Sequence, residues 1–166
     1  MTDGTLGAAN LSANGYRLPT EAEWAYAARI DSNKTLKFPW GNNYPPSRNT
    51  ANLADASAGA LATDILPGYN DGATATAAVA SYKSNARGIH DLAGNVSEWV
   101  HDFYSVAGNP GGKVATDPSG PETGKSHAIR GSSWRHGTMV ELRASYRDNG
   151  NSGRDDLGFR IARNAP

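Results

Sequence analysis

The stretch from about Asp31 to Ser84 constrains the fold most, because it carries the hydrophobic period of neither a helix nor a strand. It is interrupted by the turn-forming sequences Pro39-Trp40-Gly41-Asn42, Pro45-Pro46 and Asn70-Asp71-Gly72. The chain has 19 glycines and 9 prolines among 166 residues, more than the usual share of about 12% for these two residue types. Long irregular stretches inside a compact domain need bound ions or extensive tertiary contacts to organise them. The sequence therefore predicts a loop-rich globular domain and excludes a coiled coil or a solenoid.

The charged residues are balanced, since 16 lysines and arginines offset 16 aspartates and glutamates. This balance argues against a nucleic-acid-binding protein and against a domain that binds anionic membrane surfaces, because both need an excess of positive charge. No apolar run approaches the roughly 18 residues of a membrane-spanning helix, so we expect no membrane insertion. A chain of 166 residues has room for one domain.

Cysteine is absent from the sequence. This excludes disulfides, thiolate catalysis, zinc–thiolate sites and iron–sulfur clusters together, but it does not identify a compartment. Residues 1–7 lack both the basic and the apolar stretch of a signal peptide. The localisation is therefore open, with a periplasmic or extracellular location expected only if the chain belongs to a longer protein.

One helix start is clearly marked. Thr20-Glu21-Ala22-Glu23 forms a capping box between Pro19 and the run Trp24–Arg29, which predicts a short helix. A brief second helix is expected around Leu53–Leu61. Strands are expected at 128–134 and at 157–163, the latter with Phe159 and Ile161 on one face.

Specific motifs follow one another along the chain in the order Arg17-Leu18-Pro19-Thr20-Glu21-Ala22-Glu23-Trp24, Phe38-Pro39-Trp40-Gly41-Asn42, Gly94-Asn95-Val96-Ser97-Glu98-Trp99-Val100, Ile129-Arg130-Gly131-Ser132-Ser133-Trp134 and Gly158-Phe159-Arg160-Ile161-Ala162-Arg163. Together they resemble the formylglycine-generating-enzyme (sulfatase-modifying factor) family, over Tyr16 to Arg163. The resemblance implies an α+β fold that is irregular, loop-rich and C-type-lectin-like, with short helices and short antiparallel strands. It also implies a bacterial source.

The resemblance further implies one sulfatase-modifying-factor-like domain over residues 1–166. The family's domain usually carries more chain ahead of its Arg-Leu-Pro-Thr motif. We therefore expect this chain to correspond to the C-terminal part of that domain. It would be a fragment, a minimal version, or one chain of a split protein.

Enzymes of this family oxidise a substrate cysteine to formylglycine with a pair of copper-binding cysteines. The resemblance assigns the first of them to His136 and the second to residues 137–141, where no thiol is present. Cu(I) prefers soft thiolate ligands, and one imidazole is a poor substitute for two of them. We therefore expect no copper, no formylglycine generation and no catalytic residue of that reaction.

An iron-dependent reaction stays open. His136 and Glu141 lie in one loop and could hold two positions of a non-haem iron site. Related sulfoxide synthases use iron, but their histidines come from a separate domain. The four histidines of this chain show no ligand-grade spacing, which favours hydrogen-bonded or solvent-facing roles for His90, His101, His127 and His136.

The resemblance also implies two structural calcium sites in the irregular middle of the chain. Their oxygen ligands are assigned to Asn52, Leu53, Asp71 and Ala73 at the first site and to Asp91, Gly94, Val96 and Glu98 at the second. Ca²⁺ takes six to eight hard oxygen ligands and accepts backbone carbonyls. An ion would also order the loops. The alternative is that Asp71 belongs to an ordinary turn and Glu98 to a salt bridge.

The last candidate is a ligand-binding surface, which corresponds to the substrate groove of the family. Its residues here are Ser133, Trp134, Arg135, His136, Arg143, Tyr146, Arg147 and Asn149, with Asp148 and Arg154 beside them. Guanidinium forks, an indole and a phenol anchor peptides, carboxylates or sugars. A structural role stays open for Arg143, Arg147 and Arg160, which could pair with buried carboxylates such as Glu23 or Glu98.

These observations leave three functions open. The favoured one is a non-catalytic, calcium-stabilised binding or scaffold module that holds a protein, a peptide or a small polar ligand in a groove near Trp134–His136. The second is part of a non-haem-iron oxidase completed by another domain, by a missing N-terminal part or by a second chain. The third is a lectin-fold ligand-display protein like the variable proteins of diversity-generating retroelements.

Overall fold

The structure is a computed structural model that describes residues 13–106 and 114–164. The expectation about residues 1–7 falls outside the described part. Helix α1 (Glu21–Arg29) begins where the capping box predicts. The Thr20 hydroxyl accepts the N–H of Glu23 at 3.2 Å, and the Glu23 carboxylate accepts the N–H of Thr20 at 2.8 Å. This reciprocal pair confirms the predicted helix start.

The main sheet has four strands in the order β5-β4-β3-β6. Their bounds are β3 (Ser97–Phe103), β4 (His127–Arg130), β5 (Arg147–Gly150) and β6 (Leu157–Phe159). β4 pairs antiparallel with both β3 and β5, whereas β6 runs parallel to β3. Because β4 and β5 are neighbours, the connection over residues 131–146 leaves the sheet and returns to it beside its point of departure.

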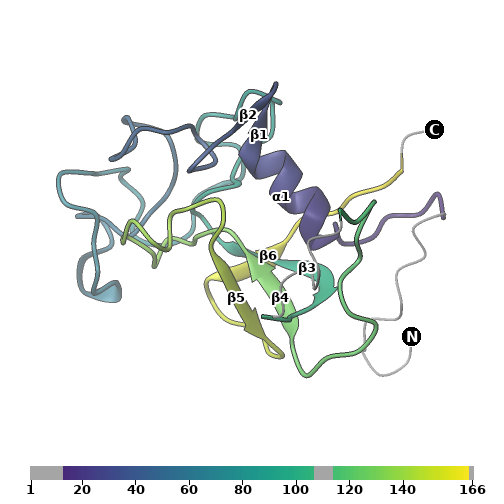
Figure 1. The fold of residues 1–166 in the computed structure, drawn as a ribbon. Coiled ribbons are helices and arrows are strands. Elements are labelled where there is room, and N and C mark those ends of the chain that lie inside the picture. The colour runs from purple at the N-terminus through teal and green to yellow at the C-terminus, as the bar shows by residue number, and fades with distance from the viewer. Residues whose placement is uncertain (1–12, 107–113, 165–166) are drawn as a thin grey trace.

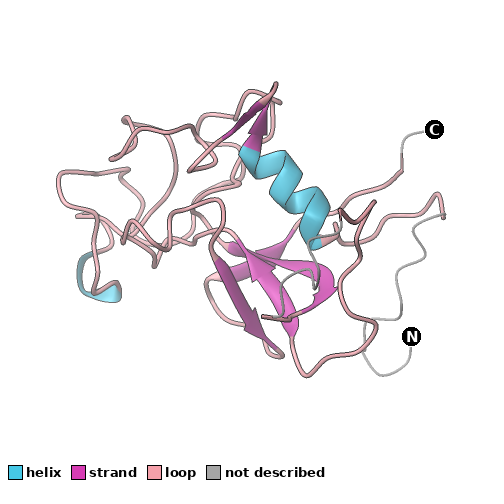
Figure 2. Cartoon of the chain, in the orientation of Figure 1, coloured by secondary structure: helices cyan, strands magenta, loops and turns pink. Residues whose placement is uncertain are grey.

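Loops make up most of the chain (Figures 1 and 2). A small sheet of β1 (Ile30–Asp31) and β2 (Lys34–Thr35) follows α1, and a 3₁₀ turn, η1, spans Gly59–Leu61. The loops of residues 38–84 gather on one side of the main sheet (Figure 1). The described part, with one α-helix and short strands, confirms the predicted α+β class. No helix within that part is long and apolar enough to cross a membrane.

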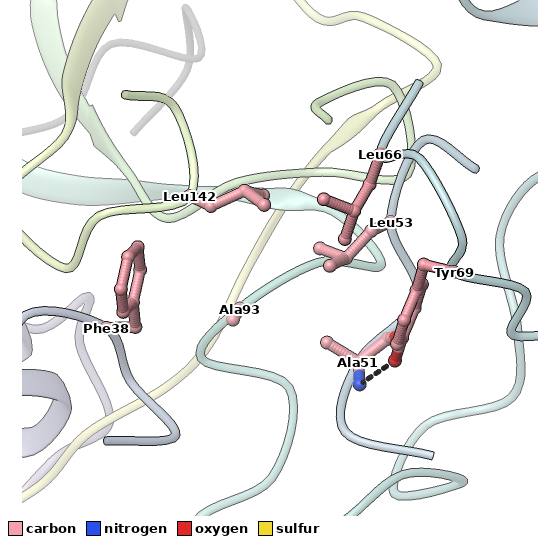
Figure 3. Packing of buried hydrophobic residues seen from close by; sticks show 7 residues of the cluster. All are labelled: Phe38, Ala51, Leu53, Leu66, Tyr69, Ala93 and Leu142. Carbon is pink, nitrogen blue, oxygen red and sulfur yellow. Dashed lines mark hydrogen bonds between the residues drawn. The ribbon is translucent and has the colours of Figure 1, made fainter. Parts of the chain in front are cut away.

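Two clusters of buried side chains hold these parts together. One lies between α1 and the sheet and consists of Trp24, Ala28, Leu92, Val100, Ala128 and Ala144. The other lies among the loops and consists of Phe38, Ala51, Leu53, Leu66, Tyr69, Ala93 and Leu142 (Figure 3). Leu142 and Ala144 both come from the connection between β4 and β5. That connection is therefore anchored in both clusters, which holds its backbone in place.

Three expected elements are shorter in the structure than the sequence predicts. β4 ends at Arg130, because Gly131 takes a φ of +78° and turns the chain away from the sheet. β6 ends at Phe159, and the side chains of Phe159 and Ile161 are both exposed. The helix expected around Leu53–Leu61 is reduced to η1, because the backbone of Ala54 bonds instead to His136 and Leu66.

Candidate ligand-binding surface and calcium positions

Ser133 lies at the start of the connection between β4 and β5 and is fully buried. Its hydroxyl donates to the Asp156 carboxylate at 2.8 Å, and its backbone N–H donates to Nδ1 of His136 at 3.0 Å. Because Nδ1 accepts this hydrogen bond, the neutral imidazole carries its hydrogen on Nε2. The two bonds fix both the turn and the orientation of the ring.

His136 stands at the position that the family resemblance assigns to the first copper-binding cysteine. Burial lowers the pKa of His136, and the nearby carboxylates of Glu141 and Asp156 only partly oppose this effect. The edge of the imidazole meets the Tyr146 ring at a centroid distance of 5.5 Å. The half-buried ring of His136 is therefore neutral at neutral pH.

Arg135 forms the outer part of this surface and covers the buried side chain of Trp134. The Arg135 guanidinium lies over the Trp134 ring, 4.2 Å from its centroid, and pairs with the exposed carboxylate of Asp155 at 2.6 Å. The Trp134 side chain is buried, and its indole N–H has no acceptor among the described residues. An exposed guanidinium stacked on an indole can bind a carboxylate or a peptide carbonyl without first being ordered.

The remaining predicted residues lie apart from His136. The Arg147 side chain points to α1, where it binds Glu21 through Nε at 2.5 Å and Nη2 at 2.7 Å. Asn149 is exposed, and its side-chain oxygen accepts the Ser126 hydroxyl at 2.9 Å. Arg143 is exposed on the connection itself. The structure thus brings together five of the eight predicted residues, namely Ser133, Trp134, Arg135, His136 and Tyr146.

Asp156 is the residue of this surface that the sequence did not reveal. It is buried, and besides the Ser133 hydroxyl it accepts Nε of Arg154 at 3.0 Å. Arg154 in turn pairs with Asp148 on β5 at 2.7 Å. This chain of polar contacts joins the first turn of the connection to β5 and to the residue just before β6. No local pattern marks Asp156, because its main partner lies 23 positions away.

The first predicted calcium position is assembled around Asp71. Its carboxylate accepts the N–H of Leu53 at 2.8 Å and the N–H of Ala73 at 2.9 Å. Asn52, the residue before Leu53, is buried, and its amide nitrogen donates to the carbonyl of Ala75 at 2.7 Å. The side-chain oxygen of Asn52 is buried, and no described residue donates a hydrogen bond to it.

A second carboxylate, that of Asp55, lies beside Asp71 and was not predicted. It is fully buried, and it accepts the backbone N–H of Asp71 at 2.6 Å. Burial, together with the charge of Asp55, raises the pKa of Asp71. Within the described residues neither carboxylate is paired with lysine or arginine. Two unneutralised carboxylates and an unpartnered amide oxygen suit Ca²⁺, so the residues of the first position fit the ion.

The second predicted calcium position has a different character. The Glu98 carboxylate is buried and accepts Nε of Arg160 at 2.6 Å, Nη2 of Arg160 at 2.5 Å and the indole N–H of Trp24 at 2.7 Å. Asp91 accepts the N–H of Ala80 at 2.7 Å. The expected alternative, a Glu98–Arg160 pair, is present. A calcium ion here would have to share Glu98 with a guanidinium, so these residues fit the ion less well in this arrangement.

The possible iron ligands His136 and Glu141 have other partners. The Glu141 carboxylate accepts the Thr138 hydroxyl at 2.7 Å and the Thr138 N–H at 3.1 Å. In the part of the chain that the structure describes, no group of three histidine, aspartate or glutamate side chains is placed to hold a metal. His90 and His127 instead contact the backbone carbonyls of Tyr82 and His101.

Comparison with known proteins confirms the family. The model of the sulfatase-modifying factor enzyme 1-like domain matches residues 3–165, and the chain belongs to this family. The formylglycine-generating enzyme of Streptomyces coelicolor is 37% identical over 164 residues, which cover 91% of this chain and 48% of that enzyme. The chain thus spans about half the length of this curated relative.

Solved structures share the same fold. Treponema denticola variable protein 1 superposes with a TM-score of 0.72 at 29% identity, covering 92% of this chain and 49% of that one. PvdO from Pseudomonas aeruginosa superposes with a TM-score of 0.67 at 30% identity, covering 90% of this chain and 53% of that one. These neighbours support the C-type-lectin-like architecture that the sequence motifs predict.

Proposed function

We propose that this chain is a non-catalytic member of its family. It acts as a binding or scaffold domain and holds a protein, a peptide or a small polar ligand on the surface of Arg135, His136 and Tyr146, above the buried Trp134. The observation that carries the proposal is the state of His136. A neutral imidazole, tied to Ser133 through Nδ1, replaces a thiolate in a chain without cysteine. Such a ring recognises ligands but does not replace a Cu(I)–dithiolate pair.

The rigidity of this surface supports a binding role. The Ser133 hydroxyl donates to the buried Asp156 carboxylate. Leu142 and Ala144 anchor the rest of the connection in the two hydrophobic clusters. Arg135 already stacks on Trp134. A surface that is ordered in advance loses little conformational entropy when a ligand binds. Aromatic and arginine side chains are also those that most often dominate binding energy.

Calcium has a structural role in this proposal. The ion would sit among Asn52, Leu53, Asp71 and Ala73, where it would neutralise Asp71 and the neighbouring Asp55. The backbone of Ala54, which lies between these residues, donates its N–H to the carbonyl of His136 at 3.0 Å. Calcium binding would therefore stabilise the loop that supports the proposed ligand surface.

Selection of random peptides displayed on phage tests the binding role. We expect peptides enriched on the wild-type protein to bind the Arg135→Ala variant at least about tenfold more weakly, because a stacked, charge-assisted contact is lost. Arg87→Ala is the matched control, because Arg87 also lies over an aromatic ring, that of Tyr26, but at a different place. Equal binding to Arg135→Ala and wild type would contradict this surface as the binding site.

The catalytic alternatives are tested separately. The protein is incubated with a cysteine-containing sulfatase peptide, copper and oxygen, and the peptide is analysed by mass spectrometry. We expect the cysteine to remain unchanged. Formylglycine in the product, or stoichiometric iron or copper in the purified protein, would overturn the non-catalytic proposal.

Ligand display is a second candidate, favoured by the structural likeness to Treponema denticola variable protein 1. The exposed residues that the connection offers for display include Arg135, Met139, Val140 and Arg143. In this proposal the codons of such positions vary between copies of the gene. Sequencing of the genomic neighbourhood tests it, since a template repeat and a reverse-transcriptase gene are required, and a neighbourhood without them excludes it.

A further inference from the structure

We propose that a cleft beside α1 binds the carboxylate of an organic acid with an apolar body, where Arg29, Arg130 and Arg147 meet. The cleft has a volume of about 390 Å³ and lies between α1 and residues 118–121. It is separate from the ligand surface around His136, because Arg147 points away from that surface toward Glu21. The inference does not depend on the proposed function.

The charges that line the cleft do not cancel. The guanidinium groups of Arg29, Arg130 and Arg147 face the carboxylates of Glu21 and Asp102. Glu21 already forms a two-point pair with Arg147 and lies 3.6 Å from Arg130. Asp102 accepts the N–H of Glu21 at 2.7 Å. One positive charge therefore remains without a carboxylate among the residues that line the cleft.

Two guanidinium N–H groups beside this cleft are buried and lack acceptors among the described residues. Arg130 is only 3% exposed, and its terminal nitrogens bind the carbonyls of Ala144, Ser145 and Tyr146. Within the part of the chain that the structure describes, neither its Nε–H nor the buried Nε–H of Arg29 has a hydrogen-bond acceptor, although the Arg130 guanidinium lies over the Trp24 ring, 5.0 Å from its centroid. Buried donors without acceptors are costly, especially on charged groups. The helix dipole favours a positive charge at Arg29, which lies in the last turn of α1. It supplies no acceptor for the Nε–H of this residue.

The pKa of Arg130 also supports an anion in this cleft. Burial lowers the pKa of Arg130 to about 10, and the positive charges of Arg147 and Arg29 act in the same direction against Glu21. A bound anion would raise the pKa of Arg130 again, because it places a further negative charge beside the guanidinium groups.

The residues that line the cleft indicate which kind of molecule bears the bound carboxylate. The floor along α1 is formed by the methyl groups of Ala22 and Ala25, and Phe103, Pro118 and Pro121 supply further apolar surface. The volume exceeds the needs of an inorganic ion. Planar guanidinium groups also match a carboxylate in two-point geometry. A carboxylate attached to a hydrocarbon group fits both parts of the cleft, whether it belongs to a free acid or to the C-terminus of a peptide.

Nuclear magnetic resonance of the ¹⁵N-labelled full chain tests the site through the Nε–H signals of its arginines. The probe is N-acetylphenylalanine, and its neutral amide is the matched control. We expect the acid to shift the signals of Arg29 and Arg130 in a saturable way and the amide to leave them unchanged. Equal shifts with the amide, or no shift with the acid, would overturn the proposal.

Two further arms identify the source and the residues. A peptide ending in Phe with a free carboxylate is compared with the free acid; binding of either supports the site, and the tighter one identifies the source. Saturable binding of inorganic phosphate but not of the acid overturns the assignment to a carboxylate.

Arg29→Gln should weaken the binding of the acid at least about tenfold, as loss of a charge-assisted pair does. Arg29→Lys should restore part of the affinity. Arg163→Gln, which changes an arginine outside the cleft, should leave binding unchanged. Unchanged affinity in a folded Arg29→Gln protein overturns the site.

Discussion

The backbone N–H of Asp71 donates to the Asp55 carboxylate at 2.6 Å, so that two acidic side chains lie next to each other in the loops that carry no regular structure. The side-chain oxygen of Asn52 belongs to the same region, where it is buried and has no partner among residues 13–106 and 114–164. Acidic groups gathered in a partly buried place without basic partners destabilise a protein unless a cation neutralises them. This relationship carries the first prediction.

Calcium should raise the melting temperature of the wild-type protein and EGTA should lower it, because a ligand held only by the native state stabilises it. The expected gain is roughly 2.7 kcal/mol when calcium exceeds its Kd a hundredfold. The Asp71→Asn variant should lose this response. A melting temperature that ignores both calcium and EGTA would contradict the calcium position.

In calcium-free buffer, the charge of Asp71 should lower the stability of the wild-type protein as the pH rises toward neutrality. The pKa of Asp71 is raised in the folded state. The stability that its protonated form contributes is therefore complete below the unfolded pKa and is lost as the pH rises through the folded value. Asp71→Asn should flatten this pH dependence. It also loses one backbone N–H bond, because an amide has one acceptor oxygen where the carboxylate accepts the N–H groups of Leu53 and Ala73. Asp64→Asn, which changes an exposed carboxylate, is the control and should alter the melting temperature in neither buffer.

Glu98→Gln tests the buried pair with Arg160. The variant removes the carboxylate that both the guanidinium and the Trp24 indole bind, and breaking a buried ion pair costs about 3–5 kcal/mol. Denaturant unfolding should show this loss equally in calcium and in EGTA. Asp155→Asn, which breaks the exposed pair with Arg135, should cause no measurable change. A loss seen only with calcium would make Glu98 a calcium ligand rather than the partner of Arg160.

Gly94→Ala tests how closely the two loop segments of the predicted calcium positions approach each other. Gly94 has a φ of +73°, and a Cβ there would lie 2.0 Å from the backbone oxygen of Asn52. We expect a largely unfolded protein by circular dichroism. Gly72 also has a positive φ, of +86°, but open space around it, so Gly72→Ala should cost only about 1–2 kcal/mol of strain. Similar losses in the two variants would show that conformation, not the contact with Asn52, requires glycine.

Part of the structure could be predicted from the sequence, because the contacts that form it join residues close together in the chain. The start of α1 is encoded by neighbours, since Thr20 and Glu23 satisfy each other's backbone within one turn. The family motifs likewise fixed the α+β class. The position of Arg147 could not be inferred, because its partner Glu21 lies 126 residues away and only the packing of α1 on the sheet brings them together. Asp156 was missed for the same reason, and β6 ended early because Arg160 turns inward to the buried Glu98.

The protonation of His136 gives the last prediction. Burial lowers its pKa below the ordinary value of 6.5, so the unfolded chain takes up a proton at a pH where the folded protein keeps the ring neutral. The contribution of His136 to stability is therefore complete above the unfolded pKa and is lost as the pH falls through the folded value. Between about pH 7 and pH 5 the free energy of unfolding should decrease, by at most about 1.4 kcal/mol per pH unit from this residue.

In His136→Asn, whose side-chain oxygen can still accept the Ser133 N–H, this part of the pH dependence of the free energy of unfolding should disappear while the protein stays folded. The pKa of His101 is also lowered by burial, so the remaining slope belongs in part to that residue. Titration of the His136 ring by nuclear magnetic resonance gives the direct measurement, and a pKa at or above the ordinary value would contradict a buried, neutral imidazole.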